Sequence, residues 1–526
     1  MNCLSQPSRI IALLTLWQLL LVPLTHAAVQ VRVGQNFNGS DNTSTFVTPA
    51  DSNGAIGPNH FVEFINGAFA VYNKTNGTNI SRISDINFWS NAGVSIAPFD
   101  TVSDPRIIYD PTVQRWFASQ VDFDATAADP TENPNDFLLA VSDTADPTGT
   151  WHGVSFVADP KTGFFADFPT LGLDGNAVYL SGDMFSFGNT MGCTVWSIPK
   201  ADLLINEIPA VITNATSFGI MSFDDRGEIL QPSICVDGSG AGDILAAGNI
   251  FSGSTLVASR VLDGNTMNAT LPPATVIPVD PYTYPIDPVQ PDGSSNLGDN
   301  EARLSASTYT FGGIIYSVQS IEVGIRAAIR WYRIDATNRT LIESGTITNA
   351  DLDLFFPSIA VTKNGVMLIC CNGSSLHVPV SSYAFVGQTI NGVTSFGDPN
   401  LLQGGTIPNY QDGGFESRWG DYSATSLDPS DPSRFWTVQL LPLTSSTWAT
   451  RITEVLVVPQ LTIATSGNNV NLSWPLFAAK YQLQSATNLS SAWSFVPQTP
   501  ATNAENISVT LPAIGSQQFF RLVEPN

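Results

Sequence analysis

Short apolar segments separated by turn residues recur along most of the chain. Seven times an apolar run is followed by a tight turn containing Gly, Asn, Asp or Pro, and then by a second apolar run. Apolar runs of this length, bounded by such residues, are typical of strands, so the pattern predicts seven β-hairpins. The seven copies begin at Asn53, Pro105, Pro169, Pro232, Arg303, Pro357 and Asp421.

The hairpins are evenly spaced. Their turns lie near Pro58, Asp110, Asp174, Asp237, Gly312, Asn364 and Asp428, about 62 residues apart on average. Further strand-like runs begin between them at Phe137, Cys193, Leu256, Ala327 and Ala449, so each unit has room for four short strands. A single sheet of this size cannot bury both faces, whereas radial stacking of such sheets buries them. The repeat therefore predicts an all-β fold, a seven-bladed β-propeller over residues 28–458. Six or eight blades are the alternatives if one copy is misread.

Two segments depart from the repeat. Residues 271–293 contain seven Pro, which cannot donate to a sheet ladder, so this segment is predicted to be a long loop between the fourth and fifth blades. After Pro459, apolar and polar residues alternate almost to the end of the chain. The alternation predicts a small β-sandwich of fibronectin type III or immunoglobulin type over residues 459–526.

Residues 1–27 have the pattern of a secretory signal peptide. An uncharged apolar run from Ile10 to Val22 follows Arg9, and small residues precede Ala28. The run is too short to span a bilayer, and no later stretch reaches roughly 18 uninterrupted apolar residues. We therefore expect cleavage near Ala27, a secreted (extracellular or periplasmic) protein without a membrane span, and a monomer.

Composition narrows the classes of ligand. The 45 acidic and 21 basic residues give a formal net charge of -24, which argues against nucleic acid, because binding to phosphates depends on Lys and Arg. The acidity is interpreted as favouring solubility outside the cell. The alternative is that clustered carboxylates bind a cation such as calcium, or meet a cationic ligand.

Cysteine and histidine are too sparse to define a scaffold or a metal site. The cysteines that follow the signal peptide are Cys193, Cys235, Cys370 and Cys371. Adjacent Cys370 and Cys371 could form only a strained vicinal pair, and one of them or Cys193 could pair with Cys235; the alternative is that at least one is a buried free thiol. His60, His152 and His377 show no metal-ligand spacing and are expected to be structural.

Charged residues recur just before the first strands of the repeats. In a propeller these strands line the central channel, so the charges should converge at one mouth, or funnel. The candidate ligand-binding residues are Asp51, Asp104, Arg106, Asp167, Arg303, Arg418, Asp421 and Tyr422. Asp299 and Glu301 also precede the fifth repeat, and the run from Glu416 to Ser423 is the densest in polar and aromatic groups.

Such a ring of residues could act in several ways. Paired carboxylates could be the acid and base of glycoside hydrolysis, Arg could clamp a carboxylate or sulfate, and Tyr422 could be a nucleophile or base. The alternative is that Asp and Arg pair with one another and tie adjacent blades together. No catalytic residue can be assigned, because no nucleophile elbow, P-loop, G-x-G-x-x-G or H-E-x-x-H motif occurs.

Several runs resemble known protein groups. The run from Ser142 to Trp151 resembles, with altered spacing, the Asp-box turn of sialidase-like propellers, which is structural. The runs DPRIIYDPTVQRWFASQ, AVSDTADPTGTW, ADFPTLGLDGNAVYLSGDMF and RWGDYSATSLDPSDPSRFW resemble a largely uncharacterised group of secreted bacterial propeller proteins, similar in outline to sialidases. The tail is similar to fibronectin-like modules of exported Verrucomicrobia proteins. The resemblance implies architecture and export and carries no established reaction. No sialidase residue is transferred, because Asp104–Ile107 lacks the sialidase order.

Two functions remain. The first is an exported, non-catalytic propeller that binds a glycan or another extracellular partner at its central funnel. The second is a carbohydrate-active enzyme, a glycoside hydrolase rather than a polysaccharide lyase, using carboxylates among Asp51, Asp104, Asp167 and Asp421. An enzyme requires two facing carboxyls in an open pocket and a shifted pKa. A binding protein requires exposed aromatic side chains and salt-bridged Asp/Arg pairs.

Overall fold

The computed structural model describes residues 29–205, 210–293, 296–363, 365–390, 392–413, 417–503, 506–513 and 517–524. Strands account for 54% of the chain and helices for 5%, which confirms the all-β prediction. The predicted signal peptide, the turn residue Asn364 and Glu416 lie outside the described residues. Over these ranges, no helix has the length and apolar character needed to cross a membrane.

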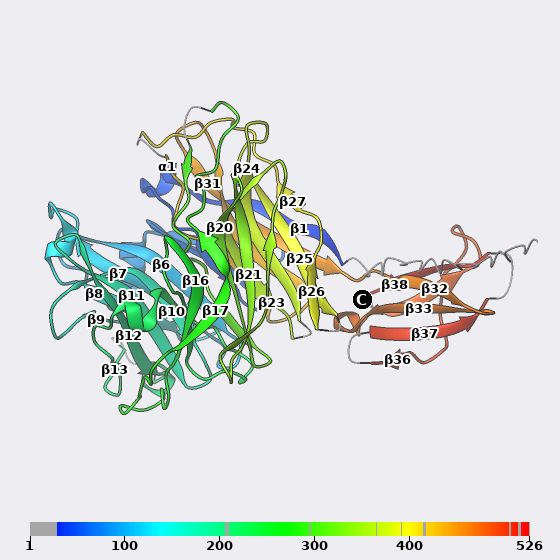
Figure 1. The fold of residues 1–526 in the computed structure, drawn as a ribbon, viewed down its shortest axis with the longest axis horizontal. Coiled ribbons are helices and arrows are strands. Elements are labelled where there is room, and N and C mark those ends of the chain that lie inside the picture. The colour runs from blue at the N-terminus through cyan, green and yellow to red at the C-terminus, as the bar shows by residue number, and fades with distance from the viewer. Residues whose placement is uncertain are drawn as a thin grey trace, which may run out of the picture.

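Up to Val458, the described chain forms seven antiparallel sheets built on four strands each (Figure 1). The first sheet holds β2 (Asn53–Ile56), β3 (His60–Ile65), β4 (Ala68–Asn73) and β5 (Asn79–Ile83). The second holds β6 (Asp100–Asp110), β7 (Arg115–Asp124), β8 (Asp136–Ser142) and β9 (Trp151–Val157). The third holds β10 (Phe165–Leu173), β11 (Ala177–Ser186), β12 (Asn189–Pro199) and β13 (Thr216–Ser217).

The remaining four sheets follow the same order. The fourth holds β14 (Glu228–Pro232), β15 (Asp243–Ala247), β16 (Ser252–Arg260) and β17 (Thr275–Thr283). The fifth holds β19 (Tyr309–Phe311), β20 (Ile314–Val323), β21 (Arg326–Asp335) and β22 (Thr340–Ile347). The sixth holds β23 (Asp353–Val361), β24 (Val366–Ser374), β25 (Ser381–Ile390), β26 (Val393–Phe396) and an added strand, β27 (Asn400–Gln403). The seventh holds β29 (Ala424–Leu427), β30 (Arg434–Pro442), β31 (Trp448–Val458) and the N-terminal β1 (Gln30–Asp41).

All seven predicted hairpins are the first two strands of a sheet, and the five predicted intervening runs are β8, β12, β16, β21 and β31. A short parallel pair, β18 (Leu297–Gly298) and β28 (Ser417–Arg418), joins two long loops. The helical segments are α1 (Asn42–Thr45), α2 (Asp85–Asn91), α3 (Lys200–Leu203), α4 (Phe223–Arg226), η1 (Pro130–Glu132) and η2 (Leu476–Ala478).

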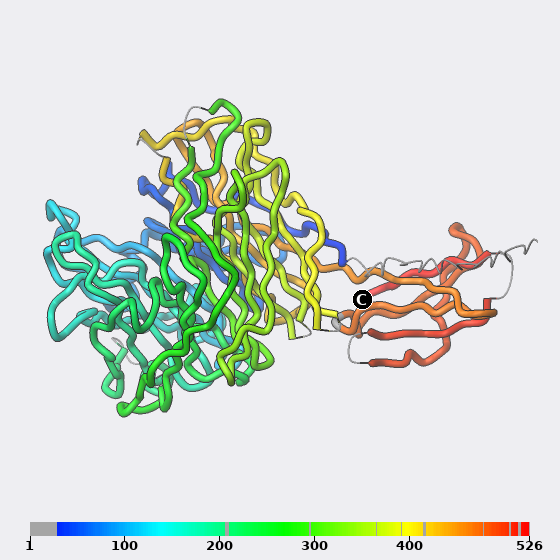
Figure 2. The backbone as a smooth tube through the Cα atoms, viewed as in Figure 1, coloured from blue at the N-terminus to red at the C-terminus, as the bar shows by residue number. Residues whose placement is uncertain are grey.

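The seven sheets form a closed ring. The first strand of each sheet packs beside the first strand of the next, and β29 packs beside β2. Between the fourth and fifth sheets the link is made by Ile234, which forms parallel bridges to Leu173 and to Tyr309. The ring has its two ends joined in the seventh sheet, because β1 pairs antiparallel with β31; Figure 2 shows the blue N-terminal tube running along the orange one.

Aspartates form several of the predicted hairpin turns. The carboxylates of Asp110, Asp174, Asp237 and Asp428 each accept a hydrogen bond from the amide two residues later, at 2.7–3.0 Å. An Asp side chain in this position replaces a backbone acceptor and fixes the turn. These four turns lie at the end of the ring opposite the predicted funnel, so their carboxylates are structural.

The Pro-rich segment corrects one prediction. Residues 275–283, expected to lie in a long loop, form β17, the edge strand of the fourth sheet. Pro278 pairs in register with Thr255 of β16, and Pro281 lies in the same strand. An edge strand tolerates Pro because only one of its sides has to donate to a ladder. The prediction excluded an internal strand and overlooked an edge strand.

The cysteines follow the alternative of buried free thiols. Cys193, Cys235, Cys370 and Cys371 are all buried and free, so none of the pairings considered above is formed. Cys370 and Cys371 are consecutive on β24, and consecutive strand residues face opposite ways. Cys370 accordingly packs among apolar side chains with Phe435, whereas Cys371 packs on the other face with Tyr316.

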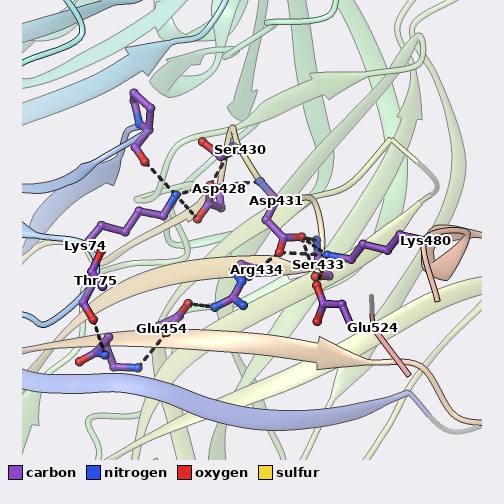
Figure 3. A network of polar contacts seen from close by, with 12 residues as sticks. Lys74, Thr75, Asp428, Ser430, Asp431, Ser433, Arg434, Glu454, Lys480 and Glu524 are labelled. Carbon is purple, nitrogen blue, oxygen red and sulfur yellow. Dashed lines mark hydrogen bonds and ion pairs between the residues drawn. The ribbon is translucent and has the colours of Figure 1, made fainter. Parts of the chain in front are cut away.

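The C-terminal segment forms two further sheets that extend away from the ring (Figure 1). One holds β32 (Thr462–Ser466), β33 (Asn469–Pro475), β37 (Asn506–Pro512) and β36 (Ala501–Thr502), and the other holds β35 (Ser494–Phe495), β34 (Gln482–Ala486) and β38 (Phe519–Val523). An ion pair connects this segment to the seventh sheet. Lys480 lies 2.9 Å from Asp431 in the β29–β30 turn, and it also lies 2.7 Å from Glu524 of the C-terminal segment itself (Figure 3).

Candidate functional site

Four of the predicted aspartates meet at one end of the ring. Carboxylate oxygens of Asp51, Asp104 and Asp421 lie within 4.8 Å of one another. Together with Asp167 and Arg418 they line an open cavity, the mouth cavity, that holds ≈ 800 Å³ of space free of protein atoms. Asp51 and Asp421 precede the first strands of the first and seventh sheets, as expected, whereas Asp104 and Asp167 lie within the first halves of β6 and β10.

A repeated β-bulge places this end of the first strands. Register shifts occur at the same point in the second, third, fourth and sixth sheets. At each shift a non-glycine residue has positive φ: Asp104 (61°), Phe168 (50°), Ile229 (53°) and Phe356 (47°). Such a conformation is costly for Phe and Ile, and bulges re-aim side chains beside functional sites. The bulge turns the second and third sheets' residues toward the mouth.

Asn66, at the turn after β3, organises the carboxylate cluster. Its side-chain amide donates to Asp51 at 2.7 Å, and its carbonyl oxygen accepts from the backbone amide of Asp104 at 2.9 Å. The other oxygen of Asp51 accepts from the amide of Asp421 at 2.9 Å. Each oxygen of Asp51 therefore accepts one hydrogen bond from the protein, while Asp421 keeps its carboxylate at the cavity, paired with Arg418 at 2.8 Å.

Burial and mutual repulsion keep protons on the cluster. Burial, followed by the charges of Asp167 and Asp421, raises the pKa of Asp104 to about 7. Burial and the charge of Asp421 also raise the pKa of Asp51 and that of Asp167. Carboxylates this close cannot all be ionised at once without a cation. Near neutral pH the cavity therefore offers both carboxylic acid and carboxylate groups.

Arg106 and Tyr422 lie deeper than the mouth cavity and fill the channel. The Arg106 guanidinium lies 3.5 Å from the centroid of the Tyr422 ring and donates to the carbonyls of Pro169 and Ser305, both at 3.1 Å. Tyr422 donates its hydroxyl to the carbonyl of Pro105 at 3.0 Å. Burial raises the pKa of Tyr422, so the phenol stays protonated, which argues against its use as a nucleophile or base.

The two remaining predicted arginines differ in accessibility. Arg303 is partly buried, with a side chain that is 14% exposed; it pairs with Glu301 and lies 4.8 Å from the centroid of the Phe168 ring. Arg418 has a side chain that is 56% exposed, so it can reach a ligand in the mouth cavity. The predicted set therefore separates into cavity residues (Asp51, Asp104, Asp167, Arg418, Asp421) and channel residues (Arg106, Arg303, Tyr422).

Sequence reasoning missed two polar residues of this end. Asn66 closes the first repeat, where only residues before a repeat were considered. Asp183 of β11 lies directly opposite Asp167 in the hairpin, and burial raises its pKa to about 8. The alternating pattern of β11 contains Asp183, but an unbulged register would have placed Met184 opposite Asp167.

The cluster also has the composition of a cation site. Asp51, Asp104 and Asp421 each offer one oxygen within a 4.8 Å circle, and oxygen ligands are those that calcium prefers. A divalent cation there would remove the mutual repulsion that raises the pKa of Asp104. The histidines take no part: His60 lies 4.0 Å from Asp146, and His152 contacts Asp143, both remote from the mouth.

The opposite end of the channel has different chemistry. A second cavity there is lined by the first strands of five sheets and by the segment after β14, and is mainly apolar, with Ile56, Tyr109, Ile234 and Ile359 in its wall. Tyr309 crosses toward the seventh sheet and donates its hydroxyl to the carbonyl of Thr425 at 3.0 Å. The polar mouth cavity is thus the end of the channel suited to a hydrophilic ligand.

Comparison with known proteins yields only weak likenesses. No family model and no curated protein matches the sequence. Among solved structures, a protein of unknown function from Dyadobacter fermentans matches at 12% identity and a TM-score of 0.36, covering 70% of this chain and 97% of that one. The α-L-arabinanase of Penicillium chrysogenum matches at 10% and 0.38, covering 81% and 98%. The sialidase of Trypanosoma rangeli matches at 9% and 0.34, covering 78% and 74%. Likenesses at these TM-scores carry no argument about activity.

Proposed function

We propose that the protein is an exported, monomeric, seven-bladed β-propeller with a C-terminal β-sandwich, and that its mouth cavity binds a glycan. The architecture is supported by the ring of seven sheets closed through β1. The single observation that carries the function is the convergence of Asp51, Asp104, Asp167 and Asp421 with Arg418 on one open cavity.

The chemistry of the cavity suits a hydroxyl-rich ligand. Carboxylates accept hydrogen bonds from hydroxyl groups, carboxylic acids and Arg418 donate them, and all of these groups are held in fixed positions by the ring. A nucleic acid or another polyanion would be repelled by four aspartates around one guanidinium. A glycan supplies hydroxyl donors and acceptors at high density without requiring an opposite charge.

Binding without catalysis is the favoured form of this function. Both oxygens of Asp51 already accept hydrogen bonds from the protein, and Asp421 is paired with Arg418. These contacts engage two of the four cavity aspartates and hold them in fixed positions, which suits recognition of a ligand. The non-catalytic reading is thus supported by the salt-bridged Asp/Arg pair that a binding protein requires.

Glycoside hydrolysis is the second candidate, and one observation favours it. The pKa of Asp104, raised to about 7 by burial and its neighbours, would let it act as a general acid near neutral pH. A carboxylate oxygen of Asp421 lies within 4.8 Å of one of Asp104, closer to the separation of about 5–5.5 Å found in retaining enzymes than to the wider one of inverting enzymes. In this form Asp104 or Asp167 would donate the proton, and Asp421 would be the nucleophile.

A polysaccharide panel tests both forms. The mature protein would be incubated with neutral, uronic and sulfated polysaccharides, with calcium or with EDTA, and both retention and soluble products would be measured. Binding predicts retention that Asp421→Asn weakens at least tenfold, without new products. Hydrolysis predicts oligosaccharides that the same substitution abolishes. Asp263→Asn, an exposed aspartate at the opposite end of the ring, should behave as wild type in both assays.

The calcium arm of the panel has its own outcome. If Asp51, Asp104 and Asp421 hold calcium, EDTA should lower glycan retention and Asp421→Asn should abolish the difference between calcium and EDTA. Equal retention in both buffers would mean that the carboxylates act directly on the ligand. No retention and no product with any polysaccharide would contradict the proposed function.

A further inference from the structure

Three large apolar side chains stand in solvent at the mouth end of the ring. Phe46, Phe99 and Phe187 have exposed fractions of 87%, 75% and 66%. They belong to three separate loops: the one after α1, the one before β6, and the β11–β12 turn. Water solvates such surfaces poorly, so they contribute nothing to stability where they lie.

The backbone at all three positions is also unfavourable. Phe46, Phe99 and Phe187 have φ angles of 60°, 80° and 49°, in the left-handed region that bulky residues rarely adopt. Phe187 and Gly188 form a two-residue hairpin loop in which both φ angles are positive, where Asn-Gly is the preferred pair. Neither side-chain burial nor backbone preference explains these three phenylalanines, which points to contact with a ligand.

Each loop borders the mouth cavity. Phe187 donates its amide to the carbonyl of Thr131, a residue that lines the cavity with Asp51 and Asp421. Thr45 and Val47, on either side of Phe46, line an adjoining depression that shares Asn66, Ser103 and Phe123 with the mouth cavity.

Phe99 is linked to the same wall. Its carbonyl accepts from the amide of Ala125, close in sequence to Phe123, and the next strand residues, Thr101 and Phe123, pair across β6 and β7. The loops that carry Phe46, Phe99 and Phe187 therefore border the side of the cavity made by the first three sheets. We call these three exposed residues the aromatic rim.

We infer that this aromatic rim binds the apolar ring faces of a neutral glycan chain whose hydroxyl groups reach the aspartates of the mouth cavity. The inference rests on the proposed function and names the ligand class. A ligand that touches both surfaces must combine hydroxyl edges with apolar C–H faces, which is the character of a pyranose ring stacked on an aromatic side chain. Uronic or sulfated chains fit the cavity less well, because the one exposed guanidinium that lines it, that of Arg418, is already paired with Asp421.

A triple variant, Phe46→Asn, Phe99→Asn and Phe187→Asn, tests the inference on the full mature chain. Asn tolerates left-handed φ better than Phe, so the variant should fold. Titration calorimetry with oligosaccharides cut from the neutral polysaccharides of the panel would measure the dissociation constant. We expect a loss of at least tenfold in the triple variant. Ile325→Asn, which removes an 82% exposed apolar side chain from the β20–β21 turn of the fifth sheet, should change affinity less than twofold.

The outcomes separate the inference from the proposed function. If the triple variant binds neutral oligosaccharides as tightly as wild type, or if wild type prefers uronic or sulfated chains, the inference is wrong while glycan binding stands. If wild type binds no glycan, both are wrong. Light scattering tests the alternative that a second copy of the chain covers the aromatic rim. If wild type is a dimer and the triple variant is a monomer, the rim is a contact between copies and the inference is wrong.

Discussion

Asp104 keeps its proton into the neutral range because burial and the charges of Asp167 and Asp421 oppose ionisation. An aspartate in the unfolded chain loses its proton near pH 4. Between about pH 4 and pH 7 the folded state therefore binds a proton that the unfolded state has lost, so raising the pH lowers stability through this window. Above the pKa of Asp104 in the folded state, the free energy of unfolding has lost the whole of this contribution and falls no further from this cause.

Replacing Asp104 by Asn should therefore stabilise the protein at alkaline pH. We expect Asp104→Asn to raise the free energy of unfolding by about 2 kcal/mol at pH 8 and to change it little at pH 4. Asn suits the left-handed backbone at this position and keeps the acceptor for Ser103. Urea unfolding at the two pH values measures the difference, and equal effects at both would contradict the assigned cause. Calcium must be absent, because a bound cation would remove the repulsion.

Arg106 stabilises the centre of the ring through two carbonyls on different sheets. Arg106→Lys should lower the free energy of unfolding by about 2–3 kcal/mol, because one ammonium cannot span the carbonyls of Pro169 and Ser305. Tyr422→Phe should cost about 1 kcal/mol, since it removes only the hydrogen bond to Pro105. Urea denaturation at pH 7 gives both values. A lysine variant as stable as wild type would show that the contacts with the carbonyls contribute little.

Among single residues, position in the repeat identified the cavity aspartates but did not identify the neighbouring polar residues that orient them. Asp51, Asp104, Asp167 and Asp421 could be predicted because each lies just before a first strand or in its first half. Asn66 and Asp183 could not, since their proximity depends on the bulge and on a turn at the far end of β3. Likewise, nothing in the composition separates the exposed Arg418 from the less accessible Arg303.

Among the elements, the β11–β12 turn is where local preference and sequence disagree. Phe187→Asn should raise the free energy of unfolding by about 1 kcal/mol, because Asn-Gly suits a turn in which both residues have positive φ. Gly188→Ala in the same turn should lower it by about 1 kcal/mol, since Gly188 has φ 69°. Thermal unfolding measures both. A loss of stability in Phe187→Asn would mean that the phenyl side chain of Phe187 packs against the protein rather than being free to contact a ligand.

Strand prediction succeeded where the pattern is local. Turn residues such as Asp110 and Asp174 set the hairpins, and each carboxylate accepts the amide that its spacing implies. Prediction failed at β17, because an edge strand containing Pro278 and Pro281 has the same composition as a loop. Only the pairing with β16 distinguishes an edge strand from a loop here, and this pairing depends on β16 as well as on the sequence of residues 275–283.

At the scale of the whole molecule, Glu63 stabilises the junction between β1 and β31, where the two ends of the ring meet. The buried carboxylate accepts from the amide and hydroxyl of Ser40 on β1, from Tyr72 at 2.9 Å, and from Thr450 on β31. Glu63→Ala would leave these donors without their acceptor. We expect a loss of about 3 kcal/mol in the free energy of unfolding, together with faster proteolysis within β1.

Urea unfolding and limited proteolysis with N-terminal sequencing of the fragments measure the two effects. Glu132→Ala, at an exposed position in η1, serves as the control and should leave both unchanged. Cleavage elsewhere than in β1 would show that the ring opens at another junction. The repeat in the sequence predicted seven units. It did not predict that the N-terminal strand β1 completes the seventh sheet, because the number of repeats does not show which strand is supplied by the other end of the chain.

The shared seventh sheet also sets an order of events during biosynthesis. Gln30 pairs with Val458, so β1, among the first strands of the chain to emerge from the ribosome or from a membrane translocon, has no partner until β31 follows. Until then the ring is open, and the edges of both strands can pair with other chains. Contacts between residues so far apart form slowly. We therefore expect closure of the ring to be a late step of folding, because it requires the chain as far as β31 to have emerged. Until that moment the unpaired strands of the nascent chain need protection from aggregation.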